Sequence, residues 1–169
     1  VVYAGSKMHD ATHLILALRS LGHERVALME GGFGAWVAEG RETAVGPWTR
    51  PATEYTMAAK RPLIGSELAS VIEASRGGHP LIVDSRPAVN FSGAEEKTEA
   101  RAGHVPHALH RAVAMDVAQA NGGVYFRPRS EIVAGYEALG VTPEVPTISM
   151  CRTGHQASQT WFLLHELLG

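Results

Sequence analysis

Short apolar runs alternate with helical periodicities along this chain. Residues 80–84 and 146–150 are apolar runs of strand length, whereas residues 66–78, 128–140 and 157–168 carry apolar side chains at helical spacing. Strands that alternate with helices predict a parallel sheet with helices on both of its faces. The expected fold class is therefore α/β.

The first part of the chain repeats this pattern on a smaller scale. Residues 1–3 predict a strand, residues 10–21 a helix that Asp10 caps, and residues 25–29 a second strand. The order strand, loop and helix occurs at residues 1–21 and again at 147–168, which indicates an internal duplication. Only the second copy contains a cysteine.

The middle of the chain is less regular. Pro47, Pro51 and Pro62 fall in a stretch without clear periodicity, which predicts a linker, and residues 55–60 within it predict an edge strand. We also expect that Ser66 caps the following helix and that a short strand lies near residues 105–109. Residues 114–127 show no clear pattern.

Composition excludes several classes of protein. The 169 residues include 15 Lys and Arg against 17 Asp and Glu, a net charge of −2, which argues against binding nucleic acid or a membrane surface through bulk charge. No apolar run approaches the roughly 18 residues that span a bilayer. The only cysteine is Cys151, so an internal disulfide and a multi-thiolate metal site are excluded.

Three histidines recur at intervals of three residues, at His104, His107 and His110. A metal site is conceivable there. However, Pro106 disfavours a regular helix, and no cluster of carboxylates accompanies the histidines. We therefore expect neither a metal nor a cofactor.

Cys151 follows directly after the predicted strand 146–150, with a helix a few residues later. Ligands bind at the carboxyl ends of the strands of an open α/β sheet. Gly154 permits a turn in which the loop amides point inward, and these amides, the helix N-terminus and Arg152 favour a thiolate. The alternative is that Cys151 is a small buried apolar residue, which is common for a lone cysteine.

Four motifs resemble those of one family. These are Asp-Ser-Arg at 84–86 with Phe-Ser-Gly at 91–93, Gly-His-Val-Pro-His-Ala at 103–108, Cys-Arg-Thr-Gly-His-Gln-Ala at 151–157, and Gly-Gly-Phe-Gly-Ala-Trp at 31–36. In this order they resemble the rhodanese (thiosulfate sulfurtransferase) superfamily in its tandem-domain form. His107 departs from the glycine that is usual in the second motif.

The resemblance implies a rhodanese-like open parallel sheet flanked by helices, with part of a second rhodanese-like unit at the N-terminus. Residues 1–46 then correspond to the C-terminal half of an inactive domain, because residues 4–9 stand at the position of the active loop without a cysteine. Residues 47–62 form the linker and edge strand. Residues 63–169 form the catalytic domain without its last strand and helix. The chain begins at Val1, so we expect it to be a piece of a longer protein.

The resemblance also implies an activity. The Cys151 thiolate takes the outer sulfur of a small anionic donor such as thiosulfate and passes it, as a persulfide, to cyanide or a thiol. The substrate-binding and loop residues implied are Arg152, Thr153, Gly154, His155, Gln156, Ala157 and Arg86. For Arg86, a structural ion pair is an equal alternative. Arg152 favours thiosulfate, although Thr153 adds no second cation.

Other functions stay open. The donor could be 3-mercaptopyruvate, or the protein could be a persulfide carrier or regulatory module without turnover. Phosphatases of this fold carry an arginine at the position of Ala157, which argues against phosphatase activity. We expect no nucleic-acid or membrane partner, and a homodimer is one arrangement the sequence allows. We expect the cytoplasm as the compartment, with the periplasm as an alternative.

Overall fold

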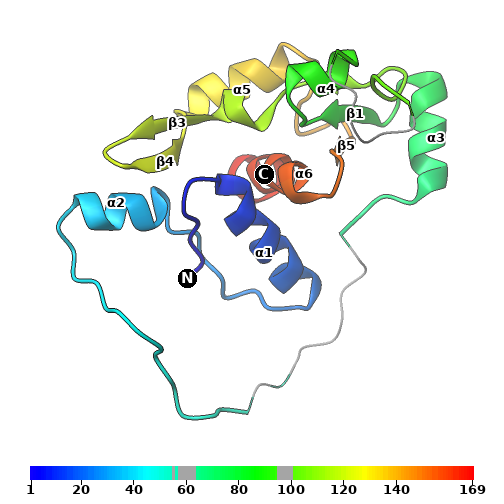
Figure 1. Cartoon of the computed structure of the whole chain (residues 1–169). Helices are drawn as coiled ribbons and strands as arrows, with labels where there is room; N and C mark the ends of the chain where they lie inside the picture. The colour runs from blue at the N-terminus through cyan, green and yellow to red at the C-terminus, as the bar shows by residue number, and fades with distance from the viewer. Residues whose placement is uncertain (55, 57–63, 95–100) are drawn as a thin grey trace. The chain divides into compact units, whose positions relative to one another are not determined.

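The computed structural model describes residues 1–54, 56, 64–94 and 101–169 (Figure 1). It divides into two compact units. One comprises residues 1–64 together with 119–125, and the other comprises residues 65–118 and 126–169. The strand expected at 55–60 lies outside the described residues, apart from Thr56.

The larger unit contains a three-stranded sheet of order β2-β1-β5, in which β1 pairs in parallel with both neighbours. The register sets Asp84 of β1 beside His110 of β2 and Met150 of β5. The carboxyl ends of all three strands therefore meet at one edge. The elements of this unit, with the hairpin β3–β4 that it shares, are α3 (Leu68–Gly77), β1 (Leu81–Asp84), α4 (Ala88–Ser92), β2 (Leu109–His110), η1 (Val113–Asp116), β3 (Val117–Ala120), β4 (Gly123–Phe126), α5 (Arg129–Glu137), β5 (Thr147–Met150), α6 (His155–Trp161) and the π-helical η2 (Phe162–Leu168).

Alternate side chains of β1 pack into two separate cores. Val83 lies with Ile132 and Tyr136 of α5 and with Leu163 of η2. Ile82 lies instead with Ala74 of α3, the helix to the right of β1 in Figure 1. Successive residues of a strand point to opposite faces, so helices cover both faces of this sheet. The expected parallel α/β architecture is confirmed.

The smaller unit contains α1 (Met8–Ser20) and α2 (Gly32–Ala38). Val2 forms an isolated parallel bridge with Leu28. Of the two strands expected at 1–3 and 25–29, only this one pair of residues is bridged. At the start of α2, the amide of Phe33 donates to the carbonyl of Ala4 at 3.1 Å. A Cβ on Gly32 would collide with the same carbonyl, which explains the glycine there.

Several boundaries differ from expectation. Helix α1 begins at Met8 with Lys7 as its N-cap, and α3 has Glu67 as its N-cap, so Asp10 and Ser66 are not the caps. The strand expected at 105–109 reduces to Leu109–His110. The loop expected through Gln156 ends earlier, because α6 begins at His155.

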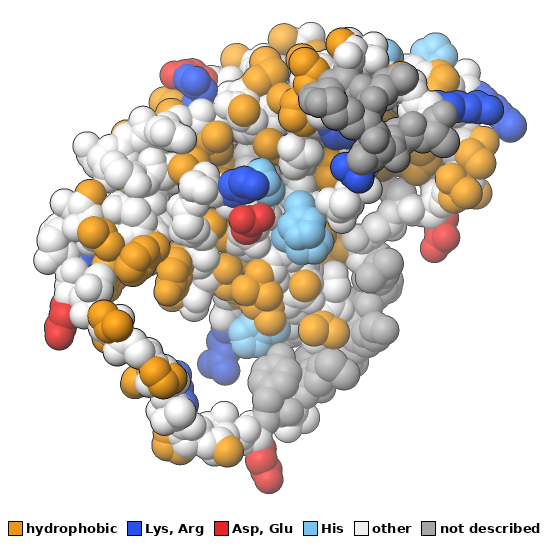
Figure 2. All heavy atoms as spheres, in the orientation of Figure 1, with side chains coloured by type: hydrophobic (Ala, Val, Ile, Leu, Met, Phe, Trp, Pro, Cys, Tyr) orange, Lys and Arg blue, Asp and Glu red, His pale blue; other side chains and the backbone are white. Residues whose placement is uncertain are grey.

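The surface agrees with the small net charge. On the face drawn in Figure 2, basic and acidic side chains are interspersed, and neither sign gathers into an extended patch among the coloured residues. Among the described residues, no helix combines the length and apolar character that crossing a bilayer requires.

Candidate active site

Cys151 stands at the carboxyl end of β5, one residue beyond Met150. Its thiol is partly exposed, and the amide of Gly154 donates a hydrogen bond to Sγ at 3.1 Å. Gly154 has φ +89° and is the N-cap of α6, so the chain turns back over the sulfur before the helix begins. A left-handed residue at this point suits glycine, which has no Cβ to clash. The sulfur thus faces a main-chain donor.

The other residues expected in the loop divide between two environments. Arg152, Thr153 and His155 are exposed, and Thr153 Oγ1 lies 3.2 Å from His155 Nδ1. Gln156 is half-buried and Ala157 is buried, both within α6. Residues 151–154 therefore form the loop after β5, and His155, Gln156 and Ala157 form the start of α6.

Arg86 follows the neighbouring strand β1 and is held in place by hydrogen bonds. Its Nε lies 2.9 Å and 3.0 Å from the two oxygens of Asp84, and its Nη2 donates to Asp84 Oδ2 at 2.6 Å and to the carbonyl of Gly103 at 2.9 Å. The Asp84 side chain is fully buried, whereas that of Arg86 is 15% exposed. These contacts favour the bracing role for Arg86 over a role in holding the donor.

Helix α6 is anchored beneath the Cys151 loop by buried polar side chains. Ser85 Oγ and Thr160 Oγ1 lie 2.7 Å apart, and Gln159 Nε2 donates to the carbonyl of Val113 at 3.0 Å. The amide of Ser85 also donates to the carbonyl of Met150 at 2.9 Å. Ser85 belongs to the Asp-Ser-Arg motif at 84–86, whereas Gln159 and Thr160 belong to none of the four motifs. The sequence signal for Gln159 and Thr160 is a run of polar residues, 158–160, directly before the apolar run 161–164.

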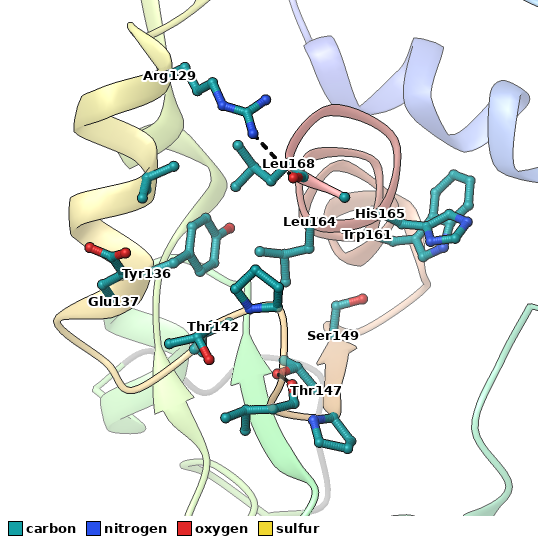
Figure 3. A pocket seen from close by; sticks show the side chains of 16 residues that line it. Arg129, Tyr136, Glu137, Thr142, Thr147, Ser149, Trp161, Leu164, His165 and Leu168 are labelled. Atoms are coloured by element: carbon teal, nitrogen blue, oxygen red, sulfur yellow. Dashed lines mark hydrogen bonds between the residues drawn. The ribbon is translucent and has the colours of Figure 1, made fainter.

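A separate cavity of about 470 Å³ opens beside β5, between α5 and η2 (Figure 3). Tyr136, Ser149, Trp161 and His165 are among the residues that line it, and none of residues 151–157 does. Arg129 donates to the carbonyls of Leu167 and Leu168 at its rim. In the described part of the chain, β1 is the only strand that pairs with β5.

The described residues contain no group of three His, Cys, Asp or Glu side chains arranged to hold a metal ion. His104 and His110 make other contacts. His104 Nδ1 lies 2.8 Å from the carbonyl of Phe91, and His110 Nε2 lies 2.9 Å from the carbonyl of Arg86.

The model of the rhodanese-like domain family matches residues 67–169, which include the whole of this site. The chain belongs to this family. The match covers the sheet, the Cys151 loop and α6, together with the motifs at 84–93, 103–108 and 151–157, so the resemblance to the rhodanese superfamily is confirmed. The motif at 31–36 lies outside the matched residues.

Known rhodanese-domain proteins agree with this assignment. A Mycobacterium bovis protein named "Putative thiosulfate sulfurtransferase 1" is 30% identical over 176 residues, which covers all of this chain and 62% of the relative. The crystal structure of SseA from Escherichia coli, described as a 3-mercaptopyruvate sulfotransferase, matches with a TM-score of 0.83 and 27% identity over 98% of this chain and 60% of its own. The structure of 3-mercaptopyruvate sulfurtransferase from Leishmania major shares the fold, with a TM-score of 0.77 and 22% identity over 99% of this chain and 46% of its own. The chain thus spans less than two thirds of the length of these relatives.

Proposed function

We propose that the chain is a sulfurtransferase that uses Cys151 as its nucleophile. The observation that carries the proposal is the hydrogen bond from the Gly154 amide to Cys151 Sγ at the carboxyl end of β5. A main-chain donor aimed at the sulfur stabilises negative charge there, both on a thiolate and on the outer sulfur of a persulfide. The names of the relatives support sulfur transfer as the reaction.

The reaction has two steps. The Cys151 thiolate attacks the outer sulfur of the donor. A new S–S bond forms between Sγ and this outer sulfur, and the bond between the outer sulfur and the rest of the donor breaks. With thiosulfate, the bonding pair leaves with sulfite. A cyanide or thiolate acceptor then attacks the outer sulfur of the persulfide and releases the Cys151 thiolate. No net oxidation occurs, and the enzyme returns to its starting state.

Thiosulfate is the donor that we propose. Arg152 stands exposed next to the nucleophile and supplies a cation for a small dianion. The match to E. coli SseA favours 3-mercaptopyruvate as a second candidate. Steady-state rates with each donor at matched concentrations separate the two, since the true donor has the higher kcat/KM.

The Cys151→Ser variant tests the proposed reaction. Thiocyanate formation from thiosulfate and cyanide should fall to the uncatalysed rate in this variant, because Cys151 is the only thiol of the chain. Intact mass after donor alone should show one added sulfur on the native chain and none on the variant. A persistent added sulfur without turnover would instead favour the persulfide carrier. Absence of both would refute sulfur transfer.

We further propose that residues 1–46 are a non-catalytic rhodanese-like unit. The motif resemblance aligns residues 4–9 with the active loop, and these residues contain no cysteine. The amide of Phe33 donates to the carbonyl of Ala4. The single added sulfur per chain in the same mass experiment is what this assignment requires.

A further inference from the structure

Two histidine rings pack against one phenylalanine ring near the Cys151 strand. The rings of Phe91 and His104 are stacked, with centroids 3.7 Å apart and an interplanar angle of 10°. His110 lies on the same phenyl ring at 4.7 Å and 31°. The three side chains come from α4, from the loop after residue 101 and from β2. The mechanism above uses none of them.

Each histidine also holds a main-chain carbonyl. His110 Nε2 lies 2.9 Å from the Arg86 oxygen, and His104 Nδ1 lies 2.8 Å from the Phe91 oxygen. A carbonyl oxygen only accepts, so each ring nitrogen must be the donor. Together with the bond from Arg86 Nη2 to the Gly103 carbonyl, three hydrogen bonds join the chain after β1 to the chain around β2.

The segment held in this way follows β1, which pairs with β5, the strand that leads into Cys151. Arg86 follows Ser85, whose amide donates to the carbonyl of Met150, the residue before Cys151. Phe91 and Met150 also pack against the same buried cluster of Ala74, Ile82 and Ala108. A shift of the Arg86 peptide would therefore pass to the peptide that leads into Cys151.

We propose that His110 is a positioning residue for the chemistry at Cys151. It acts by holding the Arg86 carbonyl while its ring, like that of His104, packs against Phe91. The inference rests on the proposed function. His110 touches neither the sulfur nor the donor in this account. Its loss should therefore lower kcat and leave the KM for the donor nearly unchanged.

Three substitutions separate the hydrogen bond from the ring. His110→Gln keeps an N–H donor at about the reach of Nε2 and removes the ring, His110→Phe keeps a ring and removes the donor, and His110→Ala removes both. His165→Gln is the matched control, because His165 also lies against an aromatic ring, that of Trp161, but belongs to η2. Thermal unfolding of each variant reports whether it folds.

We expect His110→Phe and His110→Ala to lower kcat about tenfold, the scale of a sub-ångström misplacement of a reacting group. His110→Gln should restore most of the native kcat, and His165→Gln should match the native enzyme. Two results would overturn the proposal. One is a kcat within about twofold of native in all folded His110 variants, and the other is a His110→Gln variant as slow as His110→Ala.

A second measurement keeps this test separate from the test of sulfur transfer. Iodoacetamide alkylates Cys151, the only thiol, whether or not the protein transfers sulfur. If His110 positions the loop, the alkylation rate should change severalfold in His110→Phe and return toward native in His110→Gln. Equal alkylation rates in all folded variants would refute the positioning role even where the native chain transfers no sulfur.

Discussion

Gly154 is the residue on which the geometry around the sulfur depends. Its φ of +89° turns its own amide toward Cys151 Sγ. A residue with a Cβ loses roughly 1–2 kcal/mol in the left-handed region. The loop can avoid that cost only by rotating the peptide that now donates to the sulfur.

Gly154→Ala should therefore lower kcat for sulfur transfer about tenfold or more. The amide of residue 154 moves away from Cys151 Sγ and no longer stabilises the negative charge that develops on this sulfur. Gly140→Ala is the control. Gly140 also has a positive φ, of +77°, and a Cβ there would meet nothing within 4 Å. The control should lose stability to a similar degree and keep its rate. Equal rates in the two variants would contradict the role of Gly154.

His107 occupies a position that the family usually gives to glycine, and its φ is +62°. A histidine in this region is strained, and its side chain is exposed, so no packing offsets the cost. His107→Gly should raise the free energy of unfolding by up to about 1 kcal/mol, since the loss of strain exceeds the greater entropy of an unfolded glycine. Urea denaturation measures the change, and a destabilised variant would show that the histidine makes a compensating contact.

The place of Cys151 could be predicted from the sequence, because a strand, a glycine-containing loop and a helix are contiguous in the chain. The role of Arg86 could only be narrowed, since its partners Asp84 and Gly103 are contacts that depend on the folded loop. The packing of His104 and His110 against Phe91 could not be predicted. It joins residues that are up to 19 positions apart through side-chain stacking, for which periodicity gives no signal.

At the scale of elements, the clearest omission from the sequence analysis is the hairpin β3–β4. Residues 114–127 appeared unpatterned because Ala118, Gln119 and Ala120 give a weak alternation. The signal lay in the turn, where Asn121 and Gly122 have φ of +45° and +74°. Asn-Gly between two short runs is typical of a two-residue hairpin turn with positive φ at both positions.

A buried polar network joins the loop after β2 to η1 and α5. Arg111, after β2, bonds to Asp116 Oδ1 of η1 through Nε at 2.8 Å and Nη2 at 2.5 Å, and Tyr136 of α5 donates to Asp116 Oδ2 at 3.0 Å. The Arg111 guanidinium also lies 4.5 Å from the centre of the Tyr136 ring. Burial raises the pKa of Asp116, and the charge and hydrogen bonds of Arg111 and Tyr136 oppose that rise. The buried Asp116 carboxylate is therefore stabilised by the hydrogen bonds that Arg111 and Tyr136 donate to it.

Tyr136→Phe removes one such donor and leaves a buried oxygen with one partner fewer. The free energy of unfolding should fall by about 1–3 kcal/mol, the usual cost of an unsatisfied buried group. Chemical denaturation checks this value, with Tyr3→Phe, at an exposed tyrosine, as the control that should change little. A stability equal to that of the native protein would show that water replaces the lost hydroxyl.

At the scale of the whole molecule, the two units are not consecutive stretches of chain. Residues 119–125 belong to the unit of residues 1–64, although more than 50 residues of the other unit come between. Within this unit the amide of Gly31 donates to the carbonyl of Val124 at 3.0 Å. Sequence patterns predict domains that are contiguous in the chain. The assignment of residues 119–125 to the unit of residues 1–64 could therefore not be predicted.

Proteolytic nicking tests this arrangement. Residues 41–54 are exposed and contain no helix or strand, so a protease should cut there under native conditions. The two products should stay together on size exclusion and separate only in denaturant, because residues on both sides of the cut build one unit. Separation without denaturant would show that the contacts of residues 119–125 are too weak to hold the two products together.

The bond between Gly31 and Val124 also bears on how the protein is made. More than half of the 169 positions separate Gly31 from Val124, so α1 and α2 are translated long before the hairpin that bonds to Gly31. Until the hairpin is made, the glycine-rich segment 31–34 lacks its partner at Val124. During this interval the incomplete unit can bind chaperones or aggregate. Slow translation of the codons for residues 40–125 would lengthen the time during which this segment lacks its partner.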